Sequence, residues 1–217
     1  ARTIATLLKQ AGYATAAFVA AFPVHSRFGL NAGFDVYDDR FGDGFGPTDL
    51  AMPERPASTV VPLAREWIAG RSTGTSGSGQ DAGPWFAWVH VFDPHAPYQP
   101  PPPFDTQYAG KPYYGEVAAT DAALAPLLDE VRNSARPTLV VVTSDHGEGL
   151  GDHGEEAHGI FAYESTLRVP LIVASLGGQP AASEAARQGE VSQVAARQPV
   201  GGRAAPGFGR DRLCRGG

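Results

Sequence analysis

Apolar residues along the first half of the chain follow a helical period and then a strand period, twice in succession. A helix is predicted over residues 3–10 and a buried strand over residues 13–21, with Gly12 between them. The same order returns as a helix over residues 59–69 and an apolar strand over residues 85–92. Alternation of helix and strand is typical of α/β domains, so we predict an α/β fold.

The second half contains the longest helical pattern. It covers residues 113–133 and includes Pro126, which is expected to kink or split the helix. Its predicted buried face is formed by Val117, Leu124, Leu128 and Val131. A β-branched run over residues 138–143 is typical of a central parallel strand, and residues 168–174 predict a further strand.

The remaining segments are rich in glycine, proline and small polar residues. Loops are predicted over residues 28–56, over the flexible stretch 70–83 and over residues 94–103, which hold six prolines. Residues 176–217 are mostly Ala, Gly, Gln, Ser and Arg with few large apolar side chains. We therefore predict one domain over residues 1–175 and a poorly structured tail over residues 176–217.

Charge and composition exclude several classes of function. The 217 residues carry a net charge of −6 and no basic run, so nucleic-acid binding has no electrostatic support. No apolar stretch reaches the roughly 18 residues that a membrane span needs. Cys214 is the one cysteine, which rules out an intramolecular disulfide and a cysteine-based zinc site. The sequence does not indicate a cellular compartment.

Histidines and aspartates gather after two predicted strands. Five of the six histidines lie between positions 90 and 158. His90 and His95 lie at and after the end of strand 85–92, whereas Asp145 and His146 follow strand 138–143. Ligands of open α/β sheets bind outside the carboxyl ends of strands, so we expect one shared site.

Asp145 and His146 supply a carboxylate oxygen and an imidazole nitrogen. That pair suits a divalent metal held partly by other segments. Gly147 is expected to let the backbone turn sharply, so that both side chains face one point. The alternative is an aspartate that caps the loop and a histidine satisfied by the backbone.

The other histidines are candidates for contact with a substrate. Prolines around His95 fix its approach, as an anion-contacting group requires, although a surface histidine in a loop is the alternative. His90 is either a ligand-facing or a buried core histidine. His153 and His158 are five residues apart, which excludes the zinc-protease spacing; their alternative is a solvated loop.

For the acidic residues near these histidines we predict solvated or structural roles. Glu148, Glu155 and Glu156 are expected to form a solvated face of the loop. Asp121 interrupts the apolar face of the long helix, and a buried carboxylate there needs a partner. We predict a structural hydrogen bond for Asp121, without a catalytic role.

Several motifs in this order resemble those of sulfatases. They are residues 12–18 (GYATAAF), 29–35 (GLNAGFD), 92–98 (FDPHAPY), 144–154 (SDHGEGLGDHG), 163–164 (YE) and 168–173 (RVPLIV). Together they cover about residues 3–174. The resemblance implies an alkaline-phosphatase-like sandwich, with a mostly parallel central sheet flanked by helices and incomplete at its N-terminus.

The resemblance also implies a chemistry. Sulfatases hydrolyse a sulfate ester through a covalent intermediate on formylglycine, with one divalent metal ion. By motif position, Asp145 and His146 would be metal ligands, and His95 and His158 would be catalytic. The implied substrate-binding residues are His90, His95, His153 and His158.

The sequence departs from the family pattern in three places. No Cys/Ser-x-Pro-x-Arg motif occurs, so the formylglycine nucleophile and the first metal-binding aspartates are expected upstream of Ala1, in a partial chain. His146 stands where many sulfatases have Asn, which favours manganese or zinc over calcium. The tail 176–217 does not continue the family pattern, and a shifted reading frame is one hypothesis for its origin.

These expectations define one function and two alternatives. The first is metal-dependent hydrolysis of a sulfate monoester, whose substrate is a small molecule or a carbohydrate. The second is a phosphoryl-group hydrolase or a phosphoglycerol or phosphoethanolamine transferase of the same superfamily. The third is an inactive fragment or a non-catalytic binding module. Substrate specificity is expected to lie in residues 41–56 and 100–111.

Overall fold

The computed structural model describes residues 2–41, 53–72, 83–159 and 161–178. The predicted tail from residue 179 onward, and most of the predicted loops 41–56 and 70–83, lie outside the described residues. The main elements, in chain order, are α1 (Ile4–Gln10), β1 (Ala14–Phe18), β2 (Val36–Asp38), α2 (Ala57–Ser72), β3 (Trp85–Val89), α3 (Phe104–Gln107), α4 (Pro112–Asn133), β4 (Thr138–Thr143), α5 (Glu164–Leu167) and β5 (Leu171–Leu176). Short 3-10 turns lie at Phe22–Val24, Ser26–Phe28 and Asp152–Gly154.

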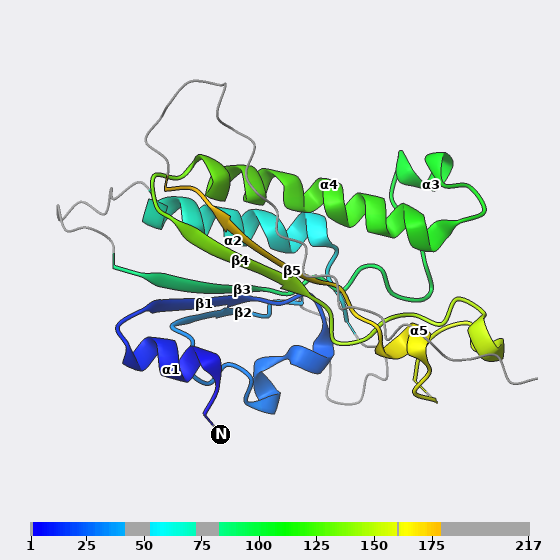
Figure 1. Ribbon diagram of the computed structural model, residues 1–217, viewed down its shortest axis with the longest axis horizontal. Coiled ribbons are helices and arrows are strands. Elements are labelled where there is room, and N and C mark those ends of the chain that lie inside the picture. Colours follow the sequence, from blue (N-terminus) through cyan, green and yellow to red (C-terminus); the bar gives the residue numbers. More distant parts are fainter. Residues whose placement is uncertain (1, 42–52, 73–82, 160, 179–217) are drawn as a thin grey trace, which may run out of the picture.

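Two sheets are present in the described part of the chain. The order β2-β1-β3 forms a parallel sheet in which Phe18 is paired with both Asp38 and Val89. Helices cover both faces of this sheet, α1 on one side and α2 with α4 on the other (Figure 1). The predicted α/β class with a parallel sheet flanked by helices is therefore confirmed.

The prediction of a central parallel strand over residues 138–143 is wrong in its pairing. β4 pairs antiparallel with β5, with Val141 opposite Val173. A β-branched composition indicates a strand that packs well but does not specify the direction of its partner. The sequence also missed β2, because its three residues are flanked by Gly, Asn and Asp.

The N-terminal helix begins where the sequence predicts. The Thr3 hydroxyl accepts a hydrogen bond from the Thr6 amide at 3.1 Å, and the Thr6 hydroxyl accepts one from the Thr3 amide at 2.8 Å. This reciprocal cap satisfies two amides that the first turn leaves unpaired. β1 follows and is almost fully buried from Thr15 onward.

The core lies between the parallel sheet and the two long helices. Ala16 and Phe18 of β1 pack against Val60 and Ala64 of α2. A second cluster joins α2 and β3 to α4, where Leu127 and Val131 are buried. Both clusters lie on the same side of the sheet. Their packing holds in place the strands whose ends carry the candidate site.

α4 differs from its prediction in its buried face. Val131 is buried as expected and Leu124 packs against the core, but Leu127 is also buried and Val117 is 40% exposed. The helix runs without a break through Pro126. Proline has no N–H to donate to the carbonyl four residues earlier, but that carbonyl belongs to Ala122, which is exposed. Asp121 is exposed, so the prediction that it is buried and needs a partner is wrong.

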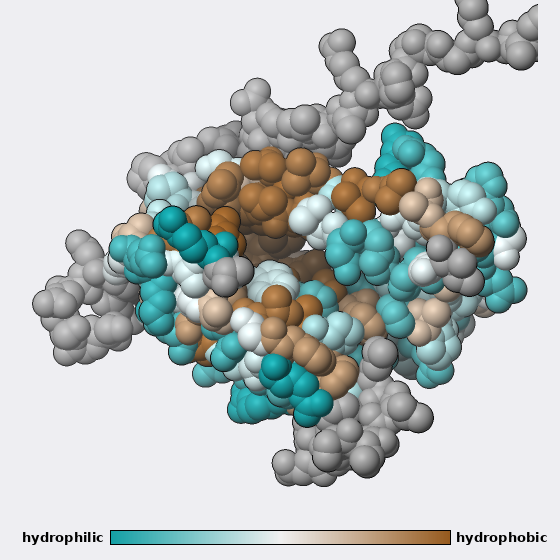
Figure 2. Space-filling view, turned by 90° about the horizontal axis from the view of Figure 1, so that it is seen from below, coloured by the Kyte–Doolittle hydropathy of each residue, from teal (hydrophilic) through white to brown (hydrophobic). Residues whose placement is uncertain are grey.

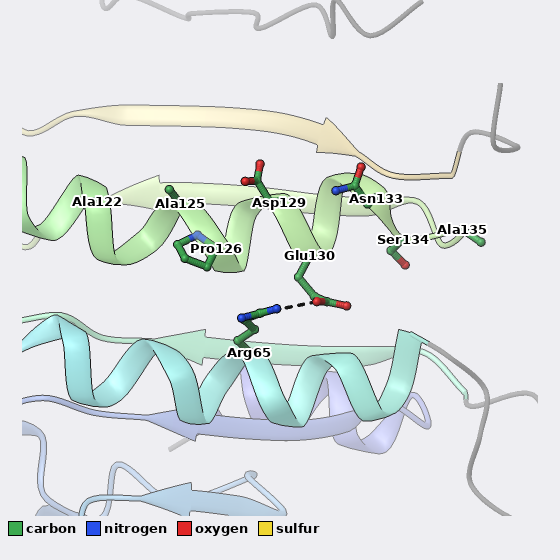
Figure 3. A pocket seen from close by; sticks show the side chains of 9 residues that line it. All are labelled: Arg65, Ala122, Ala125, Pro126, Asp129, Glu130, Asn133, Ser134 and Ala135. Atoms are coloured by element: carbon green, nitrogen blue, oxygen red, sulfur yellow. Dashed lines mark ion pairs between the residues drawn. The ribbon is translucent and has the colours of Figure 1, made fainter. Parts of the chain in front are cut away.

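A surface hollow separates the exposed sides of α2 and α4. Arg65 of α2 forms an ion pair with Glu130 of α4 across it, at 3.6 Å (Figure 3). Its lining comes from the C-terminal part of α4, whereas the histidines meet the N-terminal part, so we assign this hollow no chemistry. Among the described helices, none has the length and hydrophobicity to cross a bilayer.

Candidate active site

The strands that precede the histidines end on the same side of the molecule. β1, β3 and β4 all point toward the end where the loops containing α5 lie (Figure 1). His90 directly follows β3, and Asp145 lies two residues after β4. Burial lowers the pKa of His90, and the charge of Asp145 acts against that shift.

Three histidines from these two loops form a cluster. The rings of His146 and His158 have centroids 3.9 Å apart, and those of His95 and His158 are 5.6 Å apart. Phe92 stacks on His95, with ring centroids 4.0 Å apart. The sequence predicted that residues after two strands would share one site, and the structure brings His95, His146 and His158 together.

Glu148 orients this cluster. Its carboxylate is 6% exposed, accepts a hydrogen bond from the Tyr98 hydroxyl at 2.8 Å and lies 3.2 Å from Nδ1 of His158. Burial acts to raise the pKa of Glu148, but the hydrogen bonds from Tyr98 and His158 outweigh it and hold the pKa below its ordinary value. The prediction that Glu148 lies on a solvated face is therefore wrong.

The loop that carries His95 is held by a carboxylate that sequence reasoning missed. Glu116, buried at the start of α4, accepts hydrogen bonds from the amide of His95 at 3.1 Å and from the amide of Gln99 at 2.5 Å. Burial raises the pKa of Glu116, while the two amides act in the opposite direction. The sequence gives only a weak signal that Glu116 holds this loop, because a glutamate in a helix is usually solvated.

Asp145 and His146 present a carboxylate and a ring nitrogen close to each other. Nδ1 of His146 donates to the Gly147 carbonyl at 2.8 Å, which leaves Nε2 as a free acceptor. That Nε2 lies 3.8 Å from Oδ2 of Asp145, less than twice a metal–ligand distance of about 2.1 Å. The Asp145 side chain is 85% exposed and able to turn toward an ion.

The pair does not complete a metal site. Over the described ranges, no group of three or more His, Cys, Asp or Glu side chains has a metal-binding arrangement. Structural and catalytic metal sites use three or four protein ligands, so Asp145 and His146 fit an ion only as part of a larger set.

Gly147 is needed for a reason other than the predicted sharp turn. It is not among the described glycines with a positive φ. A Cβ at this position would lie 2.2 Å from the Ser165 carbonyl and 3.0 Å from the Arg168 carbonyl. Glycine therefore allows the segment around α5 to pack directly against the backbone beside His146.

The two remaining candidate residues, His153 and His90, have other neighbours. The ring of His153 stacks on Tyr163 at 4.1 Å, and its Nε2 lies 3.8 Å from the Asp152 carboxylate. His90 packs edge-on against Trp88, and its Nδ1 accepts from the Ala20 amide at 3.3 Å. Neither residue has a described ring contact with His146 or His158.

Comparison with known proteins identifies the family. The sequence profile described as Sulfatase matches residues 1–196. The chain therefore belongs to the sulfatase family, a family of hydrolases. No curated protein sequence matches it significantly.

Solved structures agree on the fold. A protein of the alkaline phosphatase superfamily from Vibrio parahaemolyticus is 18% identical, with a TM-score of 0.52 over 82% of this chain and 42% of its own. The protein yidJ from Bacteroides fragilis is 18% identical, with a TM-score of 0.56 over 82% of this chain and 50% of its own. The alkaline-phosphatase-like fold is thus confirmed, and the chain spans about half the length of these structures.

Proposed function

We propose that this chain forms part of a metal-dependent site for the hydrolysis of a sulfate monoester. The observation that supports the proposal is the convergence of His95, His146 and His158 at the carboxyl ends of β3 and β4, beside Asp145. Such strand ends are the usual ligand-binding edge of α/β sheets. The substrate class we propose is a sulfate ester of a small molecule or a carbohydrate.

Asp145 and His146 are the proposed metal ligands. Nε2 of His146 is the available nitrogen, since Nδ1 is used on the Gly147 carbonyl. An imidazole with a single carboxylate favours manganese or zinc over calcium. When bound, a divalent ion would polarise the sulfate oxygens and stabilise negative charge.

His95 and His158 are the proposed anion-contacting and catalytic residues. Nδ1 of His158 faces Glu148, so its Nε2 remains for a ligand, and the fixed His95 loop brings a second imidazole near it. We also propose His90 and His153 as outer substrate contacts. We assign no residue of this chain as the nucleophile, and a formylglycine would come from residues outside it.

A paramagnetic ion tests the metal ligands directly. Titrating the isotope-labelled chain with Mn²⁺ should broaden the imidazole signals of His146 and His158 before those of His25. The variants Asp145→Asn and His146→Ala should weaken this broadening about tenfold or more, since each removes one of two ligands.

Asp121→Asn is the matched control, because Asp121 is an exposed carboxylate on α4. It should leave the broadening unchanged. Equal broadening of all histidines, or full broadening in both ligand variants, would contradict the assignment.

The anion contacts need a separate titration without metal. Sulfate should shift the signals of His95 and His158 and leave His25 unchanged, and His158→Ala should remove the effect at His95. Running the titration with phosphate compares the sulfate and phosphoryl alternatives under the same conditions. No shift with either anion would remove the proposed roles of His95 and His158.

A further inference from the structure

The carboxylate of Glu148 is an acceptor shared by two loops. The Tyr98 hydroxyl donates to its Oε2 at 2.8 Å, and Nδ1 of His158 lies 3.2 Å from the same oxygen. The other oxygen, Oε1, accepts from the Gly149 amide at 3.1 Å and lies 3.3 Å from Nδ1 of His158. Each oxygen therefore has a donor besides His158, which holds the plane of the carboxylate in front of the imidazole.

This group lies at a polar end of the molecule and is nevertheless shielded from water. Seen from below, hydrophobic side chains gather around a hollow near the middle of the molecule, whereas the end that carries α5 is mostly hydrophilic (Figure 2). The Glu148 side chain is only 6% exposed, and that of His158 is 24% exposed. Water therefore competes little for the carboxylate, and hydrogen bonds are stronger in such surroundings than in open solvent.

The acceptor decides which ring nitrogen of His158 carries the hydrogen. An ionised carboxylate only accepts hydrogen bonds, so the Nδ1 that faces Glu148 carries a hydrogen. Burial and the hydrogen bond to Glu148 raise the pKa of Tyr98, so this hydroxyl keeps its own hydrogen and donates it. Nδ1 of His158 is then protonated in the neutral and in the charged ring, and any proton exchange with a ligand takes place at Nε2.

The Tyr98 hydroxyl comes from a segment that is itself fixed. Glu116 accepts hydrogen bonds from the backbone amides of His95 and Gln99, on either side of Tyr98. The donor to Glu148 is therefore tied to the start of α4, whereas Glu148 lies in the loop after β4. A donor held in this way limits rotation of the carboxylate about its last bond.

We propose that Tyr98 is a positioning residue that acts through Glu148 to keep the hydrogen of His158 on Nδ1 and to leave Nε2 for the ligand. A carboxylate that orients an imidazole in this way is the principle of catalytic triads. The inference rests on the proposed function for the ligand, a sulfate ester bound beside His158. The loop 92–99 thus serves the site twice, through the ring of His95 and through the hydroxyl of Tyr98.

The tautomer of His158 tests this role in the full chain, with EDTA present and without sulfate. Nitrogen chemical shifts of the isotope-labelled chain distinguish a ring nitrogen that carries hydrogen from one that does not. The pH is raised from about 8.5 until the ring is neutral. We expect the hydrogen on Nδ1. Glu148→Ala should lower the ratio of the Nδ1–H form to the Nε2–H form about tenfold or more, because it removes a charged acceptor.

Tyr98→Phe removes the hydroxyl and keeps the carboxylate. Without this donor the carboxylate is free to turn away from Nδ1, so the same ratio should fall by about threefold or more. In the Glu148→Ala background, Tyr98→Phe should have no further effect, because the hydroxyl acts through the carboxylate.

Tyr113→Phe is the matched control for Tyr98→Phe. The Tyr113 ring packs edge-on against Tyr98, with centroids 5.4 Å apart, and the variant keeps the Tyr98 hydroxyl on Glu148. It should leave the tautomer ratio unchanged. Circular dichroism checks that every variant is folded. If Glu148→Ala unfolds, Glu148→Gln takes its place, because it keeps the size of the side chain, removes the charge and should also lower the ratio.

Four results would overturn the positioning role of Tyr98. They are an Nε2–H form in the unchanged chain, an unchanged or higher ratio in Tyr98→Phe, an equal fall in Tyr113→Phe, and an effect of Tyr98→Phe that persists in Glu148→Ala. A higher ratio would show that the hydroxyl competes with His158 for the carboxylate.

The proposed function is tested apart from this role, because the tautomer is read without any anion. If the tautomer ratios change as expected but sulfate does not shift the His158 signals, the proposed function fails and the positioning role remains. If sulfate shifts these signals equally in the unchanged chain and in Tyr98→Phe, with equal tautomer ratios, the proposed function remains and the positioning role fails.

Discussion

At the scale of single residues, two buried glutamates position the histidines without being candidates for chemistry themselves. Glu116 holds the His95 loop by two backbone amides, and Glu148 holds His158 and Tyr98. Charged acceptors form the stronger class of hydrogen bonds, and these are shielded from water. The orientation of the cluster therefore depends on α4 as well as on the strand ends.

Replacing Glu116 by glutamine tests this role. Glutamine offers one carbonyl oxygen where two amides need acceptors, so one buried N–H is left unpaired. We expect Glu116→Gln to lower the free energy of unfolding by about 1–3 kcal/mol and to shift the His95 signals. Urea denaturation measures the first effect. Glu66→Gln, at an exposed position of α2, should change stability by less than about 0.5 kcal/mol.

Asp35 gives a prediction for acid pH. Hydrogen bonds from Lys9 and from Thr15 lower its pKa from 3.8 to about 2. Because the folded pKa is depressed, the stabilisation is present above pH 4 and is lost as pH falls through about 2. The Asp35 side chain is 41% exposed, so screening limits the effect to about 1 kcal/mol.

The measurement compares melting temperatures of the chain and of Asp35→Asn. The variant should melt lower at pH 5, and the difference should shrink toward pH 2. A difference that stays constant over this range would show that the carboxylate charge is not responsible.

At the scale of elements, the site depends on how closely the loop after β4 approaches the segment around α5. The Gly147 amide donates to the Thr166 carbonyl at 2.8 Å, and a Cβ on Gly147 would collide with the Ser165 carbonyl. Both contacts are with backbone, which has little freedom to move aside. The position of His146 is thus set by backbone packing between two elements.

We therefore expect Gly147→Ala to destabilise the fold by about 1–3 kcal/mol and to disturb the His146 and His158 signals. Gly70→Ala is the matched control, because Gly70 lies in α2 with open space around its Cα. Alanine should stabilise that helix by about 0.5–1 kcal/mol. Equal effects of the two substitutions would contradict the close approach at Gly147.

At the scale of the whole molecule, the described residues include two proposed metal ligands and no assigned nucleophile. No Cys/Ser-x-Pro-x-Arg motif occurs in the sequence. Loss of a covalent nucleophile usually lowers turnover by many orders of magnitude. We expect this 217-residue chain to show no turnover of an aryl sulfate, even with Mn²⁺ or Zn²⁺ added. Turnover well above that of His146→Ala would contradict this expectation.

Local sequence signals predicted much of the fold and part of the site. Thr3 marked the start of α1, and the apolar runs placed β1, β3 and β4 near their observed bounds. Histidines after two strands predicted a shared cluster, and three of them meet. Glu116 and Glu148 could not be assigned, because their partners are 10 to 50 residues away in the chain.

The sequence by itself determined the family, the α/β class and the residue types at the strand ends, since all of these depend on local motifs and periodicity. Only the tertiary structure decided that β4 pairs antiparallel with β5 and that Gly147 serves a close approach. The tertiary structure also decided which histidines meet. The physical reason is that strand pairing, burial of a carboxylate and contact between rings depend on residues distant in the chain, which no local pattern specifies.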